Sequence, residues 1–376
     1  MDHDVIVVGG GPAGAALAHA LQGLSTLLVA RAQRPAAEPT GFDVRVYALS
    51  PGNMAFLRQV ARLPEERLTP VHSMRVFGDA GARIEFDAYR AGVPALAWIV
   101  EDAMLQDALW NDLPGESAIA HCESLLVESG RAVLRLEGGH AHTASLVVGA
   151  DGASSFVREA AGIGTRERSY GQTAVVANFT CERPHRNTAY QWFQGGPVLA
   201  LLPLPGNRVS MVWSLAEGEA ARIVALSADA LAREVERACG GILGALAQDT
   251  APRSYPLRRL AARRLVQSRV ALAGDAAHVI HPLAGQGLNL GLQDARALAE
   301  VLLGRAPGSD PGDGALLRRY ERQRAEPILA MDLTVDGLFR LFGAASAPAA
   351  GLRNLGLNLA GRLPVLKNLL MRHAMR

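Results

Sequence analysis

The sequence predicts an α/β protein in which a Rossmann-type dinucleotide-binding domain is interleaved with an antiparallel-sheet substrate domain and followed by C-terminal helices. β-Branched residues 5–8 run into a Gly-x-Gly-x-x-Gly turn and a helix, which is typical of a Rossmann βα unit. A second strand of this character occurs at 270–273, and residues 173–215 alternate as antiparallel strands do. We therefore expect discontinuous domains, with dinucleotide binding by 1–71, 92–170 and 262–320, substrate binding by 72–91 and 171–261, and a C-terminal helical segment over 321–376.

Other segments have clear local patterns. Residues 74–86 form a predicted hairpin around Gly78 and Gly81, and 101–113 are a predicted helix. Residues 117–148 give three alternating strand runs separated by glycine-containing turns. Further helices are predicted over 228–247 and from Gly287 to about residue 303.

Composition excludes several classes of protein. The chain has 376 residues, of which 49% are apolar, so it is long enough for more than one ordinary core. Its formal net charge is only +2, and no concentrated basic face occurs over the first 330 residues, which argues against a nucleic-acid partner. The three cysteines, Cys122, Cys181 and Cys239, are far apart, which predicts a reducing compartment and neither a disulfide framework nor a zinc site.

The N-terminal residues and the hydropathy predict a cytoplasmic protein. Asp2 and Asp4 occupy positions where a signal peptide would be basic, and the apolar run that follows is short. No run approaches the roughly 18 apolar residues of a membrane span. We expect the protein in solution or peripherally on the inner face of the cytoplasmic membrane.

The first motif is a glycine turn directly after a strand. Gly9 permits the tight turn, Gly11 lets the backbone approach a pyrophosphate, and Gly14 lets helix and strand pack closely. The helix that follows points its N-terminus at the anion. A merely glycine-rich turn is the alternative, and the flanking strand and helix favour the dinucleotide site.

The acidic partner that usually follows such a turn by about 20 residues is missing. The apolar run 26–29 follows at the spacing of a βαβ unit, Ala30 ends this strand, and Arg31 comes next. An arginine at this position favours a nucleotide 2′-phosphate, hence NADP. Losing one charge-assisted hydrogen bond costs roughly 1.5 to 3 kcal/mol, which would weaken retention of a dinucleotide without abolishing it.

The second motif contains Asp151 and Gly152 at the end of an apolar strand, with Arg158 one turn later. The carboxyl end of such a strand lies at the ligand crevice of an α/β sheet. Alternatively, Asp151 or Ser154 caps the next helix. The residues alone leave both interpretations open.

The third motif combines several special residues in a short span. An apolar strand ends in Gly274 and Asp275, a proline loop follows, and a Gly-x-Gly turn at Gly285 and Gly287 opens a helix. This geometry offers a carboxylate to ligand hydroxyls and a helix N-terminus to a carbonyl or an anionic ring.

In this order and spacing, the three motifs resemble the fingerprints of single-component FAD-dependent aromatic hydroxylases of the para-hydroxybenzoate hydroxylase-like class. The sequence is most similar to the ubiquinone-biosynthesis hydroxylases, and the resemblance covers nearly the whole chain. It is carried by Asp43-x-Arg45-x-x-Ala48-Leu49-Ser50, by Val212-Trp213-Ser214, and by Gly274-Asp275-Ala276-Ala277-His278 through Asn289.

The resemblance implies a para-hydroxybenzoate hydroxylase-like fold, bound FAD and NAD(P)H as a transient reductant. It implies that the FAD pyrophosphate is held by Gly9, Gly11, Pro12, Ala13 and Gly14. Arg45 would lie near the flavin or pyrophosphate, and Asp275 would bond the ribityl chain and pyrophosphate region. Gly274 is a further predicted cofactor contact, and Asp151 would help to position the reductant. The isoalloxazine would lie against Pro282, Gly285, Gln286, Gly287, Leu288 and Asn289. Ala30, where the family commonly has Glu, and Ala103, where Arg is often found, depart from the pattern.

The implied activity is hydroxylation of an aromatic ring, a polyprenylated phenol of ubiquinone biosynthesis. By this resemblance NAD(P)H would reduce the flavin and a flavin C4a-hydroperoxide would be the oxidant, so no catalytic residue is assigned. Alternatives are a flavin-dependent reductase, a halogenase or another aromatic hydroxylase on the same fold, and a non-catalytic flavin-binding subunit of a quinone-biosynthesis complex. The halogenase segment Trp-x-Trp-x-Ile-Pro does not occur in the sequence.

Some residues have both a functional and a structural interpretation. Leu201, Pro203 and Trp213 are candidate substrate contacts, and Trp192, Trp213 and Phe193 either line a substrate cavity or fill the core of the sheet. His278 and His281 lack a clustered third ligand, so we expect capping or packing roles and no metal.

The C-terminal segment is basic and apolar. After Asp336 it contains no acids but carries Arg340, Arg353, Arg362, Lys367, Arg372 and Arg376 among leucines. Such a segment could dock on anionic lipid, or it could form a helical pair that covers the dinucleotide-binding domain.

Overall fold

The computed structural model describes residues 1–32, 41–78, 81–281 and 286–343, with side chains placed up to Gly337. Its first sheet has the order β18-β19-β11-β1-β2-β8. The central strands are parallel and β18 is antiparallel to β19, while β9 and β10 extend β11 as an antiparallel meander. The strands are β1 (His3–Val8), β2 (Thr26–Ala30), β8 (Glu116–Ile119), β9 (Cys122–Glu128), β10 (Arg131–Leu136), β11 (Ala141–Gly149), β18 (Val266–Gln267) and β19 (Val270–Leu272).

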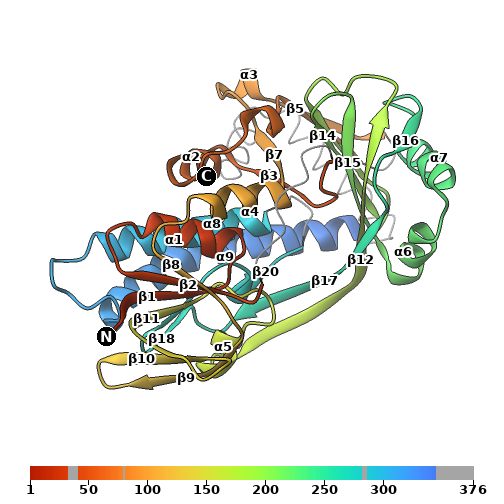
Figure 1. The fold of residues 1–376 in the computed structure, drawn as a ribbon. Helices are drawn as coiled ribbons and strands as arrows, with labels where there is room; N and C mark the ends of the chain where they lie inside the picture. Colours follow the sequence, from red (N-terminus) through yellow and green to blue (C-terminus); the bar gives the residue numbers. More distant parts are fainter. Residues whose placement is uncertain (33–40, 79–80, 282–285, 344–376) are drawn as a thin grey trace.

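Helices cover this sheet because its strands are apolar on both faces. Figure 1 shows α1, α4, α8 and α9 on one side of the sheet and α5 with the β9–β10 hairpin on the other. Val5, Ile6 and Val7 are fully buried in the resulting core. The helices are α1 (Pro12–Ala20), α4 (Asp102–Asn111), α5 (Phe156–Ala160), α8 (Gly287–Leu303) and α9 (Gly314–Gly343).

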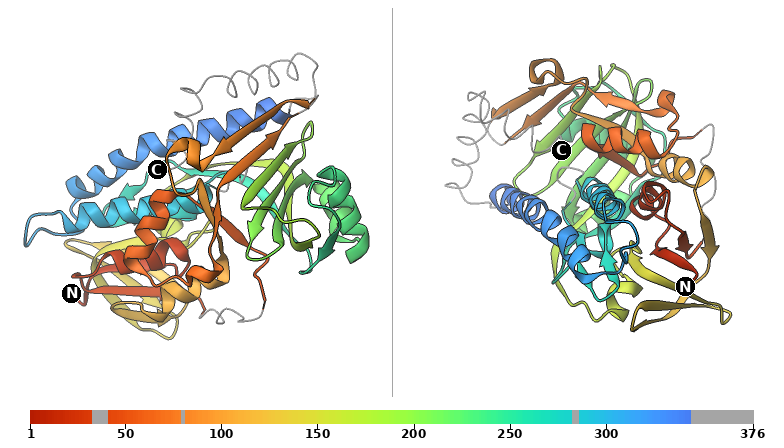
Figure 2. Two further views of the ribbon diagram at one scale, coloured as in Figure 1. Left: turned by 90° about the horizontal axis from the view of Figure 1, so that it is seen from above. Right: turned by 90° about the vertical axis from the view of Figure 1, so that its left-hand side faces the viewer.

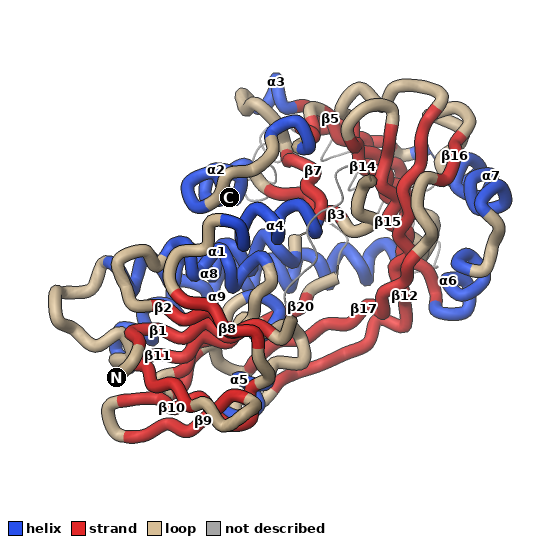
Figure 3. The backbone as a smooth tube through the Cα atoms, in the orientation of Figure 1, coloured by secondary structure: helices blue, strands red, loops and turns tan. Residues whose placement is uncertain are grey.

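The second sheet has the order β20-β17-β12-β15-β14-β13-β5-β6, with β16 paired to β12. Its strands are β5 (Ser73–Phe77), β6 (Arg83–Asp87), β12 (Thr165–Cys181), β13 (Thr188–Phe193), β14 (Val198–Leu204), β15 (Arg208–Ala216), β16 (Leu246–Gln248), β17 (Arg253–Ala262) and β20 (His278–Val279). Figure 3 shows the long strands β12 and β17 running from the first sheet to the far end of the molecule. There, α6 (Glu217–Val224) and α7 (Ala228–Ala238) pack on one face of the second sheet (Figure 2).

A small third sheet was not anticipated from the sequence. It has the order β3-β7-β4, formed by β3 (Val46–Leu49), β4 (Thr69–Val71) and β7 (Ala97–Glu101). Around it lie α2 (Pro51–Val60), α3 (Ala88–Ala91) and the 3-10 turn η1 (Glu65–Arg67). These strands are three to five residues long, too short to give a clear alternation.

Most predicted elements are confirmed, and two need correction. The predicted hairpin at 74–86 and the helices α4 and α8 are present. The predicted helix 228–247 is wrong beyond Ala238, because Gly240 and Gly241 adopt left-handed φ values of 66° and 64° that end it. The three predicted runs over 117–148 are four strands, since the first run breaks between β8 and β9.

Within the part of the chain that the structure describes, no helix is long and apolar enough to cross a membrane. The basic positions from Arg353 to Arg376, and the predicted cofactor contacts Pro282 and Gly285, lie outside the described residues.

Candidate functional site

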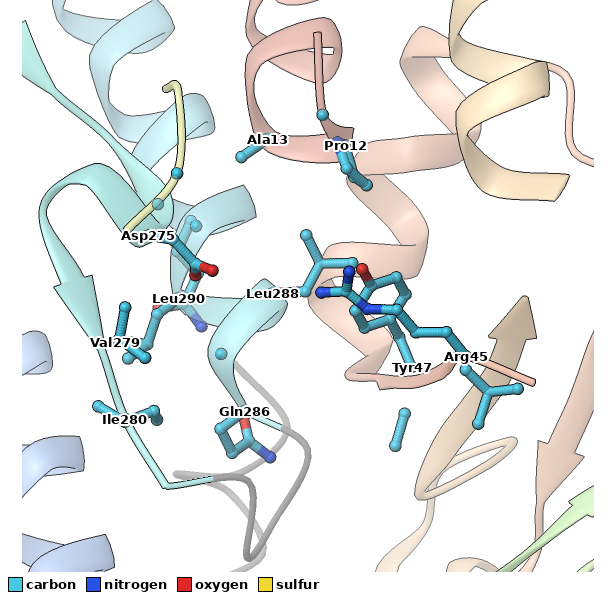
Figure 4. Close-up of a pocket in the computed structure, with 18 of the residues that line it drawn as sticks. Pro12, Ala13, Arg45, Tyr47, Asp275, Val279, Ile280, Gln286, Leu288 and Leu290 are labelled. Carbon is cyan, nitrogen blue, oxygen red and sulfur yellow. The ribbon is translucent and has the colours of Figure 1, made fainter. Parts of the chain in front are cut away.

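A cavity of about 1680 Å³ lies where the three sheets and the helix layer meet. It is lined by the glycine turn before α1, the beginning of α8, the 3-10 turn η3 (Gly274–Ala276) and strands of the second and third sheets. Figure 4 shows Pro12 and Ala13 on one side of this cavity, Asp275 on another, and Arg45 with Tyr47 across from Asp275. The structure therefore brings together residues from all three sequence motifs.

The glycine turn is built for close backbone contact. Gly9 has a φ of 122°, and a Cβ at Gly14 would lie 2.0 Å from the carbonyl oxygen of Gly9. A Cβ at Gly11, in contrast, would meet nothing within 4 Å, and Gly11 lines the cavity. Gly11 is also the N-cap of α1 and gives it no side-chain hydrogen bond. The first amides of α1 thus remain available to an anion in the cavity.

The N-terminus of α8 faces the same cavity. Gln286, Gly287 and Leu288 line it, and the N-cap Gln286 makes no side-chain hydrogen bond to the helix. Asn289 is fully buried, and its side chain is hydrogen-bonded within the protein. Its Oδ1 accepts from Ser50 N at 2.8 Å, and its Nδ2 donates to Ala48 O at 2.7 Å. The side chain of Asn289 therefore joins α8 to β3 and α2, its backbone carbonyl accepts from Asn53 Nδ2 at 3.1 Å, and Asn289 is not among the residues that line the cavity.

Asp275 presents its carboxylate to the cavity (Figure 4). The protein that surrounds it raises its pKa, while His278 and Arg45 partly offset this effect. The preceding residue, Gly274, has a φ of 61°, and a Cβ at Gly291 would lie 3.1 Å from its Cα. Small residues at this crossing let η3 and α8 approach closely enough to place Asp275 beside the helix start.

Arg45 is held by two aromatic rings and one carboxylate. Its guanidinium lies 5.4 Å from the centre of the Tyr47 ring and 5.9 Å from that of Tyr255. Its Nη1 is 3.8 Å from Oδ2 of Asp102, whose Oδ1 accepts from the Tyr47 hydroxyl at 3.1 Å. Burial is the main reason that the pKa of Tyr47 is raised, so this hydroxyl is neutral. Tyr47 and Tyr255 both line the cavity and were missed by the sequence analysis, although Tyr47 follows Arg45 at strand spacing.

A buried charged cluster fixes the loop that carries Asp275. Asp294 on α8 accepts from Nε2 of His278 at 2.6 Å, from Nε of Arg324 on α9 at 2.6 Å, and from Gly274 N at 3.0 Å. Asp294 is fully buried, and its two charged partners are at most 5% exposed. Burial would raise the pKa of Asp294, but His278 and Arg324 outweigh that effect and lower it. The cluster ties η3, α8 and α9 together at one carboxylate.

Asp151 serves the chain locally as well as lining the cavity. It accepts from Ser155 Oγ and from Val157 N, and Ser155 is the residue that caps α5. The buried Arg158 donates to the carbonyls of Ala153 and Ala276, which links the second motif to the third. The segment does cap a helix, but the cap is Ser155 and not Asp151 or Ser154, so the capping interpretation named the wrong residues.

The two positions that depart from the family pattern are also placed. Ala30 and Arg31 line the cavity near the glycine turn. The amide of Ala103, at the start of α4, donates to Oδ2 of Asp43 at 2.9 Å, so that helix begins on a carboxylate.

The three candidate substrate contacts lie on the face of the second sheet that points away from the cavity. Leu201 and Trp213 belong to the core between that sheet and α6 and α7. Pro203 shares the face of Leu201 because it is two residues along the same strand. The cavity is lined instead by the alternate positions Ala200, Leu202 and Val212. The prediction that Leu201, Pro203 and Trp213 line the cavity is corrected, and the core interpretation of Trp213 is confirmed.

The neighbouring aromatic residues divide between the two sides. Phe193 lines the cavity, whereas Trp192 packs against the core and stacks on Phe77 with ring centroids 5.2 Å apart. Both faces of this sheet are apolar, so alternation alone does not reveal which one faces a ligand.

Both histidines of the third motif make contacts within the protein. No group of three metal-ligating side chains occurs among the described residues. His278 belongs to the charged cluster, and His281 Nε2 lies 3.2 Å from Oε1 of Gln172. Burial lowers the pKa of His281 to about 4, so it is neutral at physiological pH.

Comparison with known proteins identifies the family. The protein-family model described as the FAD binding domain matches residues 2–331. Ubiquinone hydroxylase UbiL of Rhodospirillum rubrum is 38% identical, covering 99% of this chain and 89% of the relative. The 3-demethoxyubiquinol 3-hydroxylase of Escherichia coli is 33% identical, covering 99% of this chain and 98% of the relative.

Solved structures agree on the fold. The p-nitrophenol 4-monooxygenase PnpA of Pseudomonas putida DLL-E4 superposes with a TM-score of 0.79 at 18% identity, covering 99% of this chain and 98% of that one. The para-hydroxybenzoate hydroxylase-like fold expected from the sequence is thereby confirmed. The chain belongs to the FAD-dependent aromatic hydroxylases, in the group of the ubiquinone-biosynthesis hydroxylases, and FAD is its cofactor.

Proposed function

We propose that the chain is a monooxygenase that hydroxylates the ring of a polyprenylated phenol in ubiquinone biosynthesis. In the overall reaction one atom of O2 replaces a ring hydrogen by hydroxyl, the other leaves as water, and NAD(P)H supplies two electrons. The names of the two relatives support this substrate class. The observation that carries the proposal is a single cavity that joins two helix N-termini and a carboxylate to an apolar wall.

The residues present fit FAD. A pyrophosphate fits the open space over Gly11, where the amides of α1 are uncapped. We assign this end of the cofactor to Gly9, Gly11, Pro12 and Ala13, which line the cavity, and to Gly14, which lets α1 pack closely on the glycine turn. A carboxylate facing the cavity, that of Asp275, suits the hydroxyls of a ribityl chain. The start of α8 at Gly287 and Leu288 suits a ring that becomes anionic on reduction, because its amides and its dipole favour negative charge.

When bound, FAD accepts electrons from NAD(P)H and activates oxygen, so the chain need not supply a nucleophile. The work of the chain is to position the ring and to exclude water from it. Ala200, Leu202 and Val212 form an apolar wall opposite the cofactor residues, and Gln191 adds a single amide on the same sheet. None of the described residues of this wall is a cation that could pair with a carboxylate, which favours a neutral phenol over a benzoate at this surface.

The carboxylate of Asp275 provides the direct test. Replacing Asp275 with alanine is expected to raise the dissociation constant for FAD by about 10- to 100-fold, the equivalent of losing one charged hydrogen bond. Titration of apoprotein with FAD, followed by fluorescence quenching, measures it. Asp275→Asn keeps the shape of the side chain, and its dissociation constant for FAD is expected to lie between those of the wild type and Asp275→Ala.

Turnover is measured on the same proteins. Wild-type protein loaded with FAD should oxidise NAD(P)H faster when a phenol is present and yield a product heavier by one oxygen atom. If Asp275→Ala binds FAD as tightly as the wild type, the assignment of Asp275 to the cofactor site is wrong. If no phenol tried gains an oxygen atom, the proposed activity is wrong.

We further propose that the C-terminal segment contacts the membrane surface, where a polyprenylated substrate resides. The support is its sequence: six basic residues and no acid after Asp336, among leucines. Flotation of the full chain with anionic vesicles, but not with neutral ones, is the expected result. Equal behaviour with both kinds of vesicle would contradict it.

A further inference from the structure

One end of the cavity is walled by hydrocarbon. Six of its lining residues form a separate cluster of buried side chains, which we call the apolar compartment: Val76, Ile84, Phe193, Ile280, Leu290 and Val335. None of the six carries a polar side-chain atom. The whole cavity, at about 1680 Å³, exceeds the roughly 300 to 1,000 Å³ that is usual for a single small ligand. There is therefore room for a second ligand beside the cofactor.

The walls of the compartment come from well-fixed elements. Val76 and Ile84 are directly opposite each other in the β5–β6 hairpin, and β5 is paired with β13, which carries Phe193. On the other side, α9 contributes Met331 and Val335, which are four residues apart and so share one face of the helix.

Two ion pairs hold α9 in this place. Arg259 of β17 binds Asp332, and Arg168 of β12 binds Asp336 at 2.7 Å. These acids precede and follow Val335 along the helix, so the wall is anchored on both sides of it. The compartment is thus part of the fold, built between the second sheet and α9.

The compartment is continuous with the part of the cavity that fits the cofactor. Ile280 follows the strand that leads away from Asp275, and Leu290 is on α8 close to Leu288, as Figure 4 shows. A ligand with its ring near Leu288 can therefore extend a chain past Leu290 and Ile280 without leaving the cavity. Such a chain must be apolar, because burying hydrocarbon here is favourable and burying unpaired polar groups is costly.

We propose that the apolar compartment between the β5–β6 hairpin and α9 binds the hydrocarbon chain of the substrate and so sets the preference for chain length. This proposal rests on the proposed function, because it assigns a place to one part of the same substrate. The chain enters between Val76 and Ile84 on one side and Val335 on the other.

Filling the compartment tests the assignment. Ile84→Trp is expected to raise KM for a long-chain polyprenyl phenol about tenfold or more, while kcat/KM for the unprenylated phenol stays within about twofold, since only chain binding is obstructed. The matched control is Leu333→Trp on α9, whose side chain is 61% exposed on the outer side of the helix, and it is expected to leave both substrates unaffected. If Ile84→Trp does not retain FAD, Met331→Phe narrows the same space from α9.

Two outcomes would overturn the assignment: an equal loss for long and short substrates in FAD-loaded variants, or no loss for either. Hydroxylation of the unprenylated phenol by wild-type protein tests the proposed function separately, because it does not use the compartment. Binding of a polyprenyl alcohol, measured by calorimetry, tests the compartment without turnover. Wild-type protein should bind this alcohol about tenfold more tightly than Ile84→Trp, and equal affinities would contradict the proposal.

Discussion

Alanine in place of Gly14 is expected to destabilise the protein by about 3 kcal/mol or more, at the upper end of overpacking costs, and to abolish FAD binding. The new Cβ would lie 2.0 Å from the carbonyl oxygen of Gly9 and 3.1 Å from the Cβ of Ala150. The first of these neighbours is backbone, so relief requires α1 to move away from β1. Urea denaturation of the apoprotein measures the first effect, and FAD titration measures the second.

Gly11→Ala is the matched control for this prediction. Its Cβ would meet nothing within 4 Å, and the φ of −71° at this position suits alanine. The apoprotein should therefore unfold at the same urea concentration as wild type. If Gly14→Ala proves as stable as Gly11→Ala, the close packing of α1 on the glycine turn is not what holds this part of the fold.

Removing the carboxylate of Asp294 is expected to lower the free energy of unfolding by about 3–5 kcal/mol, because it leaves Arg324 and His278 buried without their partner. The backbone N–H of Gly274 would also lose the carboxylate that accepts its hydrogen bond, so the loop that carries Asp275 should loosen. The affinity for FAD should therefore fall together with the stability of the protein. Urea denaturation and FAD titration of Asp294→Ala test both effects.

A surface pair provides the comparison. Glu65 and Arg58 are joined by two hydrogen bonds of 2.9 and 2.8 Å, and their side chains are 61% and 42% exposed. Glu65→Ala is expected to cost at most about 1 kcal/mol and to leave FAD binding unchanged. A similar cost for the two variants would mean that the buried cluster contributes no more than an exposed pair.

The cluster also predicts how stability depends on pH. Since its partners lower the pKa of Asp294, the contribution of this carboxylate is present above the unfolded value of about 3.9 and is lost as the pH falls through the folded pKa. Burial lowers the pKa of His278, but the effect of Asp294 is larger, so the net pKa of His278 is raised. The contribution of His278 to stability is therefore complete below its unfolded pKa of about 6.5 and is lost as the pH rises through its folded pKa. The difference between wild type and Asp294→Ala should therefore be largest between these two values.

The cofactor half of the site could be predicted from the sequence because its chemistry needs special residues. Gly9 and Gly14 are required by contacts too close for a side chain, and such positions stand out as glycine spacing. Helix α8 begins at Gly287, as the Gly-x-Gly turn predicts. Local backbone requirements of this kind are visible in the order of residues.

The substrate half could not be predicted in the same way. Trp213 and Val212 are neighbours on one strand, and only the placement of α6 and α7 decides which of them is core and which lines the cavity. Tyr255 and Val335 join the cavity through contacts between segments far apart in the chain. Contacts between distant segments leave no periodic pattern in the sequence, because they depend on how whole helices and strands pack.

The order of strands in the first sheet has a consequence for biosynthesis. Strand β19 lies beside β11, and β11 beside β1, so the middle of this sheet joins residues 3–8 to a segment that is translated much later. A nascent chain on the ribosome lacks Asp275, Asp294 and the beginning of α8 until most of the polypeptide has been translated. Cofactor capture is therefore a late step in the folding of the new chain, because the glycine turn is translated earlier but forms only one part of the binding site.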